Sequence, residues 1–77
     1  MVKAYVLIEI NGVNAYKAAA EMTKIKEVEN VDIIDGEYDL MALVGAKNLS
    51  SLKELALQKI GKVKGVVKTS TLIIADE

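Results

Sequence analysis

The chain has 77 residues, 52% of them hydrophobic, and a formal net charge of −1. It contains no Cys and no His, which excludes disulfides, thiol nucleophiles, zinc-type sites and imidazole bases. All ten basic residues are Lys, so no Arg is present to hold a phosphate or carboxylate in a bidentate pair.

A chain of this length buries only about 60% of the surface that it exposes when unfolded. Without disulfides or a metal, association with other subunits is the remaining way to reinforce so small a core. No apolar run is long enough to cross a membrane, and the three Tyr and the net charge do not favour nucleic acid binding. We therefore expect one domain, residues 1–77, that is cytoplasmic and binds no metal, cofactor, DNA or membrane.

The hydrophobic pattern switches between strand and helix periods along the chain. The expected elements, in chain order, are a strand at 2–10, a helix at 15–26, a strand at 28–34, a strand at 38–46, a helix at 49–60 and a strand at 66–75. Asn14 is expected to cap the first helix, and Asn48 or Ser50 the second, which Gly61 ends. The segment Asp35-Gly36-Glu37 is typical of a tight hairpin turn.

This β-α-β-β-α-β order, with two halves of similar length, predicts an α+β, ferredoxin-like fold. We expect a four-stranded antiparallel sheet that carries both helices on one face. Right-handed crossovers place the first and third strands in the centre and the second and fourth at the edges.

Strand alternation assigns the apolar residues to two faces of this sheet. The helix side is predicted to hold Val6, Ile8, Leu40, Ala42, Val44, Leu72 and Ile74. The other side is predicted to hold Tyr5, Leu7, Met41, Leu43 and Ile73, with Thr69 and Thr71 beside them. Five large apolar side chains on a face without helices form a patch that monomers seldom expose, so these five are predicted to form a homodimer interface.

Charge is also unevenly distributed. Six acids and no Lys occur from Glu27 to Asp39, whereas four Lys and no acid occur from Lys59 to Lys68. The fold places these runs at opposite edges of the sheet. Two interpretations stay open: ordinary solvated edges, or head-to-tail contacts that form a ring or filament.

No set of residues supports catalysis. Ser50 and Ser51 lack a base, and the acids lack the spacing of a calcium loop. The segment from Gly61 to Gly65 lacks the Gly-Lys-Ser/Thr ending of a phosphate loop and precedes a strand. We therefore predict that the chain is not an enzyme.

Two segments remain, Gly36-Glu37-Tyr38-Asp39 at the hairpin and Thr69-Ser70-Thr71 in the last strand. Together with the opening Val-Lys-Ala-Tyr-Val-Leu-Ile, Leu40-Met41-Ala42 and Gly65-Val66-Val67, they make the chain resemble the ligand-sensing RAM domain of the leucine-responsive regulator/AsnC family. The resemblance covers nearly the whole chain. Members of that family carry an N-terminal helix-turn-helix domain, whereas this chain starts at the first strand, and Lys64 replaces the family's usual Pro.

The resemblance implies a stand-alone effector-binding and oligomerisation domain that modulates transcription regulators of the same family. Dimers would form through the sheets and assemble further, and a small effector, an amino acid or similar metabolite, would bind between subunits. The effector-binding residues implied are Ile34, Gly36, Tyr38, Asp39, Thr69 and Thr71. Full-length regulators of the family are the further partners implied.

Three other interpretations stay open at this point. The ACT domain shares the element order and binds amino acids, but usually carries a Gly-rich turn where this chain has only Gly12. The others are a small dimeric ferredoxin-like enzyme and an oligomer that binds no ligand.

Overall fold

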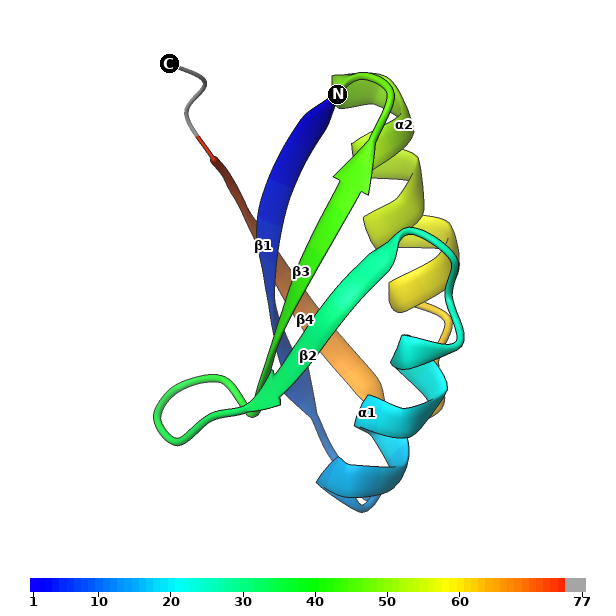
Figure 1. Ribbon diagram of the computed structural model, residues 1–77. Coiled ribbons are helices and arrows are strands. Elements are labelled where there is room, and N and C mark those ends of the chain that lie inside the picture. The colour runs from blue at the N-terminus through cyan, green and yellow to red at the C-terminus, as the bar shows by residue number, and fades with distance from the viewer. Residues whose placement is uncertain (75–77) are drawn as a thin grey trace.

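Four strands form a single antiparallel sheet with helices on one side (Figure 1). The computed structural model describes residues 1–74. The elements are β1 (Val2–Ile10), α1 (Ala15–Thr23), β2 (Val28–Ile33), β3 (Leu40–Ala46), α2 (Leu49–Glu54), the π-helical turn η1 (Leu55–Ile60) and β4 (Val66–Ile73). The strand order β2-β3-β1-β4 confirms the ferredoxin-like prediction, with β1 and β3 in the centre.

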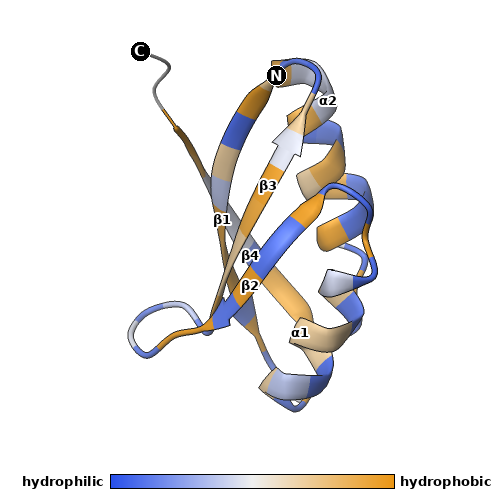
Figure 2. Ribbon diagram, in the orientation of Figure 1, coloured by the Kyte–Doolittle hydropathy of each residue, from blue (hydrophilic) through white to orange (hydrophobic). Residues whose placement is uncertain are grey.

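The core lies between the sheet and the helices. Val6 of β1 is opposite Ala42 of β3, and Ile8 is opposite Leu40; all four are fully buried. Opposed residues of antiparallel strands share a face, so this register fixes the helix side of the central strands. The helices complete the core with Met22, Leu52 and Ile60. Figure 2 shows that β3 is apolar along most of its length, with a pale end at the arrowhead, whereas hydrophilic and apolar residues intermingle along the edge strand β2.

Helix starts follow the predicted caps. The Asn14 side chain accepts hydrogen bonds from the backbone N–H groups of Tyr16 and Lys17, and that of Asn48 accepts one from Ser51. These bonds satisfy donors that the first turn of a helix leaves free.

Several predicted ends were wrong. Helix α1 was predicted to end at residue 26 but ends at Thr23, and Lys24 forms its C-cap. Strand β2 ends at Ile33 and β3 begins at Leu40, so residues 34–39 form an open loop and not a three-residue turn. The second helix spans 49–60 as predicted, but widens into the η1 turn, in which the Gly61 N–H donates to the Ala56 carbonyl. The predicted end of the last strand, Ala75, lies outside the described residues.

The predicted faces of β4 were wrong as well. Ile10 of β1 pairs with Val66, but the preceding residue, Glu9, pairs with Lys68, so Val67 is an extra residue in β4. A bulge of this kind inserts one residue and reverses the alternation beyond it. Thr69, Thr71 and Ile73 therefore lie opposite Ile8, Val6 and Ala4 on the helix side. Leu72, predicted on the helix side, pairs with Tyr5 on the other side, and Ile74, also predicted there, is 39% exposed.

Candidate functional site

The face of the sheet without helices carries a continuous apolar surface, which we call the outer patch. The register places Tyr5 opposite Leu43 and Leu7 opposite Met41, on the side away from the core. Four of the five predicted interface residues thus share this face. Ile73 does not; its place beside Tyr5 is taken by Leu72, which is 52% exposed. The outer patch therefore consists of Tyr5, Leu7, Met41, Leu43 and Leu72.

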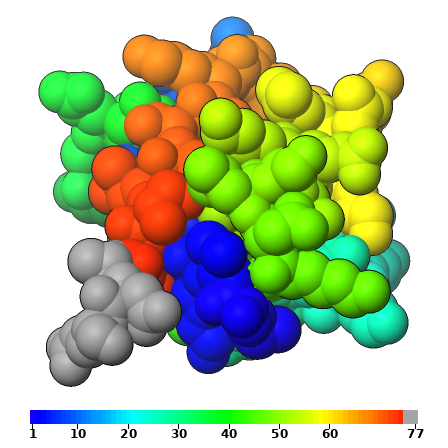
Figure 3. All heavy atoms as spheres, turned by 90° about the horizontal axis from the view of Figure 1, so that it is seen from above, coloured from blue at the N-terminus to red at the C-terminus, as the bar shows by residue number. Residues whose placement is uncertain are grey.

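The hairpin loop, residues 34–39, stands away from the body of the molecule. Figures 1 and 3 show it on the side opposite the helices. A Cβ atom built on Gly36 would meet nothing within 4 Å, so the tip is unpacked in a single copy. Ile34 and Tyr38 are partly exposed near the ends of this loop. A ligand at the hairpin would need a second subunit to enclose it.

Asp39 holds the base of this loop against the central strand. Its Oδ2 accepts a hydrogen bond from the backbone N–H of Ile10 at 2.8 Å. Its own backbone N–H donates to the Ile8 carbonyl at 2.9 Å, and its carbonyl accepts from the Ile34 N–H at 2.9 Å. One carboxylate oxygen is thus committed to the fold, and the side chain remains only partly buried.

Lys68 also lies beside the hairpin loop, which the sequence analysis did not predict. Its Nζ lies 5.8 Å from the centroid of the Tyr38 ring, a cation–π distance that joins the start of β4 to the hairpin loop. The only sequence signal was one cation in an otherwise apolar and hydroxyl-bearing strand. Lys68 therefore places a positive charge beside the hairpin loop.

Thr69 and Thr71 do not share a face with the outer patch, contrary to the prediction. Both are half-buried on the helix side of the edge strand β4. Thr69 lies in the same row of the sheet as Leu40, two strands away, which is about 10 Å. Thr69 also lines a hollow of about 200 Å³ with Leu57 and Val67 at the sheet edge. The structure therefore brings Ile34, Gly36, Tyr38 and Asp39 together at the hairpin and leaves the two threonines at the edge.

The acidic and basic runs are partly neutralised within the chain. Lys59 Nζ lies 3.0 Å from Glu27 Oε2, and Lys3 Nζ lies 3.2 Å from Glu29 Oε1. The hydrogen bond from Lys59 lowers the pKa of the Glu27 carboxyl below its ordinary value of 4.5. Two of the six acids and one of the four Lys in these runs are thus paired within the chain, and the head-to-tail interpretation stays a prediction.

Among residues 1–74, no three acidic side chains come together in a group that could hold a metal ion. None of the helices in this described part of the chain has the length and apolarity needed to cross a lipid bilayer.

Comparison with known proteins gives a consistent picture. The family model for the Lrp/AsnC ligand binding domain matches residues 3–77. A helix-turn-helix-type transcriptional regulator of Pyrococcus abyssi, itself uncharacterised, is 32% identical over 76 residues, which are 95% of this chain and 51% of that protein. The chain thus spans about half the length of the curated relatives that it matches.

Solved structures agree. The crystal structure of TTHA0845 from Thermus thermophilus is 31% identical with a TM-score of 0.90, covering 100% of this chain and 96% of that one. A transcriptional regulator of Neisseria meningitidis, solved as a complex with L-Met, has a TM-score of 0.86 at 19% identity, covering 99% of this chain and 51% of that one. The second likeness shows the shared fold.

Proposed function

The chain belongs to the Lrp/AsnC ligand-binding domain family, and on this premise we propose that it binds a small effector between subunits and modulates transcription regulators of that family. The effector class that we propose is an amino acid or a similar metabolite. The family membership also decides against the ACT interpretation. The relatives are transcriptional regulators, which agrees with a role other than catalysis.

The observation that carries the proposal is the outer patch. Tyr5 is 38% exposed and Leu72 is 52% exposed, and they lie beside three further apolar side chains on a face that no helix covers. Burying a large apolar side chain contributes about 1.5–3 kcal/mol. Two copies that packed their outer patches together would bury this surface, and the projecting hairpin of each would lie against the other.

The effector site that we propose is formed by Ile34, Gly36, Tyr38 and Asp39 of the hairpin, with Lys68 beside them. Lys68 attracts a carboxylate, and the Asp39 oxygen not bound to Ile10 attracts an ammonium group. Thr69 and Thr71 contribute from the edge of β4, where a neighbouring subunit would bring the effector within reach. The L-Met complex of the Neisseria meningitidis regulator supports an amino acid as the class of effector.

The domain would regulate transcription through its effect on full-length regulators of the family. The curated relatives extend about as far again beyond the matched region and are helix-turn-helix-type regulators. We propose that this domain acts on such proteins either by mixed assembly through the outer patch or by competing for the effector. Co-expression with a full-length regulator tests this step, which fails if the two chains never co-purify.

Native mass spectrometry of the purified protein, followed by calorimetric titration with the twenty amino acids, tests the proposal. We expect dimers or larger assemblies and binding of at least one amino acid, weakened by Asp39→Asn and by Lys68→Gln. A Thr71→Val variant asks whether the β4 edge takes part. A folded monomer at high concentration that binds no amino acid would overturn the proposed function.

A further inference from the structure

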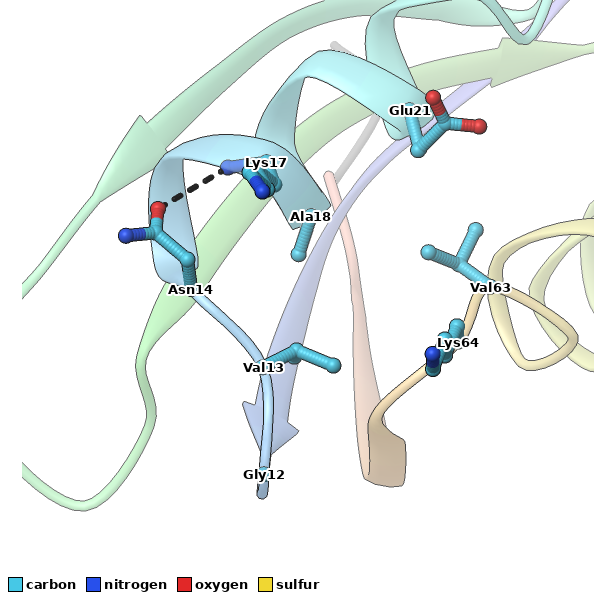
Figure 4. Close-up of a pocket in the computed structure, with 8 residues that line it drawn as sticks. All are labelled: Gly12, Val13, Asn14, Lys17, Ala18, Glu21, Val63 and Lys64. Carbon is cyan, nitrogen blue, oxygen red and sulfur yellow. Dashed lines mark hydrogen bonds between the residues drawn. The ribbon is translucent and has the colours of Figure 1, made fainter.

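A groove on the helix side of the molecule, far from the outer patch, has the features of a small-molecule site. It lies between α1 and the loop of residues 61–65, and its volume is about 340 Å³. Figure 4 shows Val13, Ala18 and Val63 directed into the gap from its two sides. An adjoining hollow of about 440 Å³ continues the groove past Ile25. Sites for small organic ligands are concave, largely apolar and of this size.

The two walls of the groove are fixed to each other. The backbone N–H of Asn11 donates to the Gly65 carbonyl at 2.8 Å, joining the β1–α1 turn to the loop before β4. The contact is so close that a Cβ atom on Gly65 would overlap Cγ2 of Val13. The groove therefore exists before any ligand arrives, which lowers the entropic cost of binding.

The charged groups at the rim select for an anion. Lys17 of α1 and Lys64 of the loop stand on opposite walls (Figure 4), and neither has an ion-pair partner among the described residues. Glu21, the acid at the rim, lies 2.9 Å from Lys24 Nζ and is already paired. The first-turn N–H groups of Tyr16 and Lys17 are occupied by the Asn14 cap, so the two ammonium groups are what an anion would meet.

We propose that this groove binds a small carboxylate with an apolar body. The carboxylate lies between Lys17 and Lys64, and the body packs on Val13, Ala18 and Val63. The site does not require an α-ammonium group, because Glu21, the acid at its rim, already forms an ion pair with Lys24. The site is thus distinct in place and in selectivity from the hairpin site proposed above, and it is complete within one subunit.

The test follows the methyl resonances of Val13, Ala18 and Val63 by NMR while the whole protein is titrated with isocaproate. Isoamylamine carries the same apolar body with the opposite charge, inorganic phosphate is an anion without a body, and leucine adds an ammonium group. We expect saturable shifts with isocaproate, equal or weaker shifts with leucine, and none with isoamylamine or phosphate.

Variants separate the contribution of the Lys charges from that of the apolar contacts. Lys17→Gln and Lys64→Gln should each weaken isocaproate binding by roughly three- to tenfold, the range for a partly exposed charged hydrogen bond. Lys53→Gln, an exposed Lys on α2, is the matched control and should change nothing. Val63→Thr keeps the shape of the side chain and should weaken binding through the lost apolar contact, with circular dichroism verifying that the variant is folded.

Equal shifts with isoamylamine, or shifts that phosphate reproduces, would overturn the inference by showing that no carboxylate with an apolar body is selected. The absence of any shift at the three methyl groups would overturn it as well. Resonances of Tyr38 and Asp39 report on the hairpin separately. Shifts confined to the hairpin would reject the groove. Shifts at the groove with isocaproate would support the groove, and the proposed function would still be decided by the titration with the twenty amino acids.

Discussion

The carboxylate of Asp39 accepts a hydrogen bond of 2.8 Å from the backbone N–H of Ile10 across the base of the hairpin. This bond extends the pairing of β1 with β3 beyond its last ladder pair, Ile8 with Leu40. The same side chain is proposed to meet the effector. Its substitution therefore affects stability as well as binding, and the two effects need separate variants.

We expect Asp39→Ala to lower the free energy of unfolding by about 1–3 kcal/mol, because it leaves the partly buried N–H of Ile10 without a partner. Asp39→Asn keeps an acceptor oxygen in the same place and should cost less than half as much. Urea unfolding at one fixed protein concentration measures both. Equal losses in the two variants would show that the charge, and not the hydrogen bond, is what stabilises the hairpin.

The central strands could be predicted from the sequence because their alternation is uninterrupted. Val6 and Ile8, like Leu40 and Val44, face the helices as parity requires. The faces of the edge strand β4 could not be predicted, because the bulge at Val67 reverses the alternation of side chains. Nothing in the local sequence indicates that bulge. The same bulge explains why Leu72, and not the predicted Ile73, lies in the outer patch.

Only the part of the candidate site that lies in one short segment of the chain could be predicted. Residues 34–39 lie in one loop, so the turn residues in the sequence were enough to predict that they lie together. Lys68 reaches Tyr38 from a strand that is distant along the chain, and this proximity depends on the register of β4. The groove between Val13 and Val63 was also not foreseen, because it depends on how closely two turns approach each other.

We expect Leu43→Lys to convert the assembly to a monomer of 8.3 kDa in sedimentation velocity. Leu43 lies in the outer patch opposite Tyr5, and burying a Lys ammonium in an apolar interface is costly. Leu57→Lys is the matched control: Leu57 is 67% exposed on η1, on the helix side, and its substitution should leave the assembly intact. An unchanged sedimentation coefficient for Leu43→Lys would place the interface elsewhere.

The ion pair of Glu27 with Lys59 should make the thermal stability of the protein depend on pH, with a loss in acid. The pKa of Glu27 is lowered in the folded chain, chiefly by the hydrogen bond from Lys59, so the unfolded chain binds the proton more readily. The contribution is therefore present above pH 4.5, the ordinary value, and is lost as the pH falls through the folded value. We expect Lys59→Met to have a lower Tm than the parent at neutral pH and the difference to disappear in acid.

Thermal unfolding of both proteins across this pH range measures the effect. Lys53→Met, which removes an exposed Lys from the neighbouring turn of the same helix, is the control and should follow the parent. A difference between Lys59→Met and the parent that persisted unchanged in acid would mean that Lys59 stabilises by packing and not through the Glu27 carboxylate.

The contact between Gly65 and Val13 gives the last prediction. Gly65 has a φ of +93°, and an added Cβ would overlap one methyl carbon of Val13 and lie 2.7 Å from the other. Gly65→Ala therefore combines backbone strain of about 1–2 kcal/mol with a steric clash. Gly12→Ala separates these terms, because Gly12 has a φ of +74° but open space around it, so only the strain applies. We expect Gly65→Ala to be the more destabilising of the two in urea unfolding.

A double-mutant cycle isolates the clash. Val13→Ala removes both methyl carbons, so the Val13→Ala/Gly65→Ala protein should be more stable than the sum of the two single losses predicts. Strictly additive losses would show that the loop before β4 moves away from the β1–α1 turn to accept the Cβ. In that case the groove would have no fixed walls, and the NMR shifts expected for isocaproate should be small in the parent protein too. Rescue in the double variant would instead establish that close packing of these two turns holds the groove open.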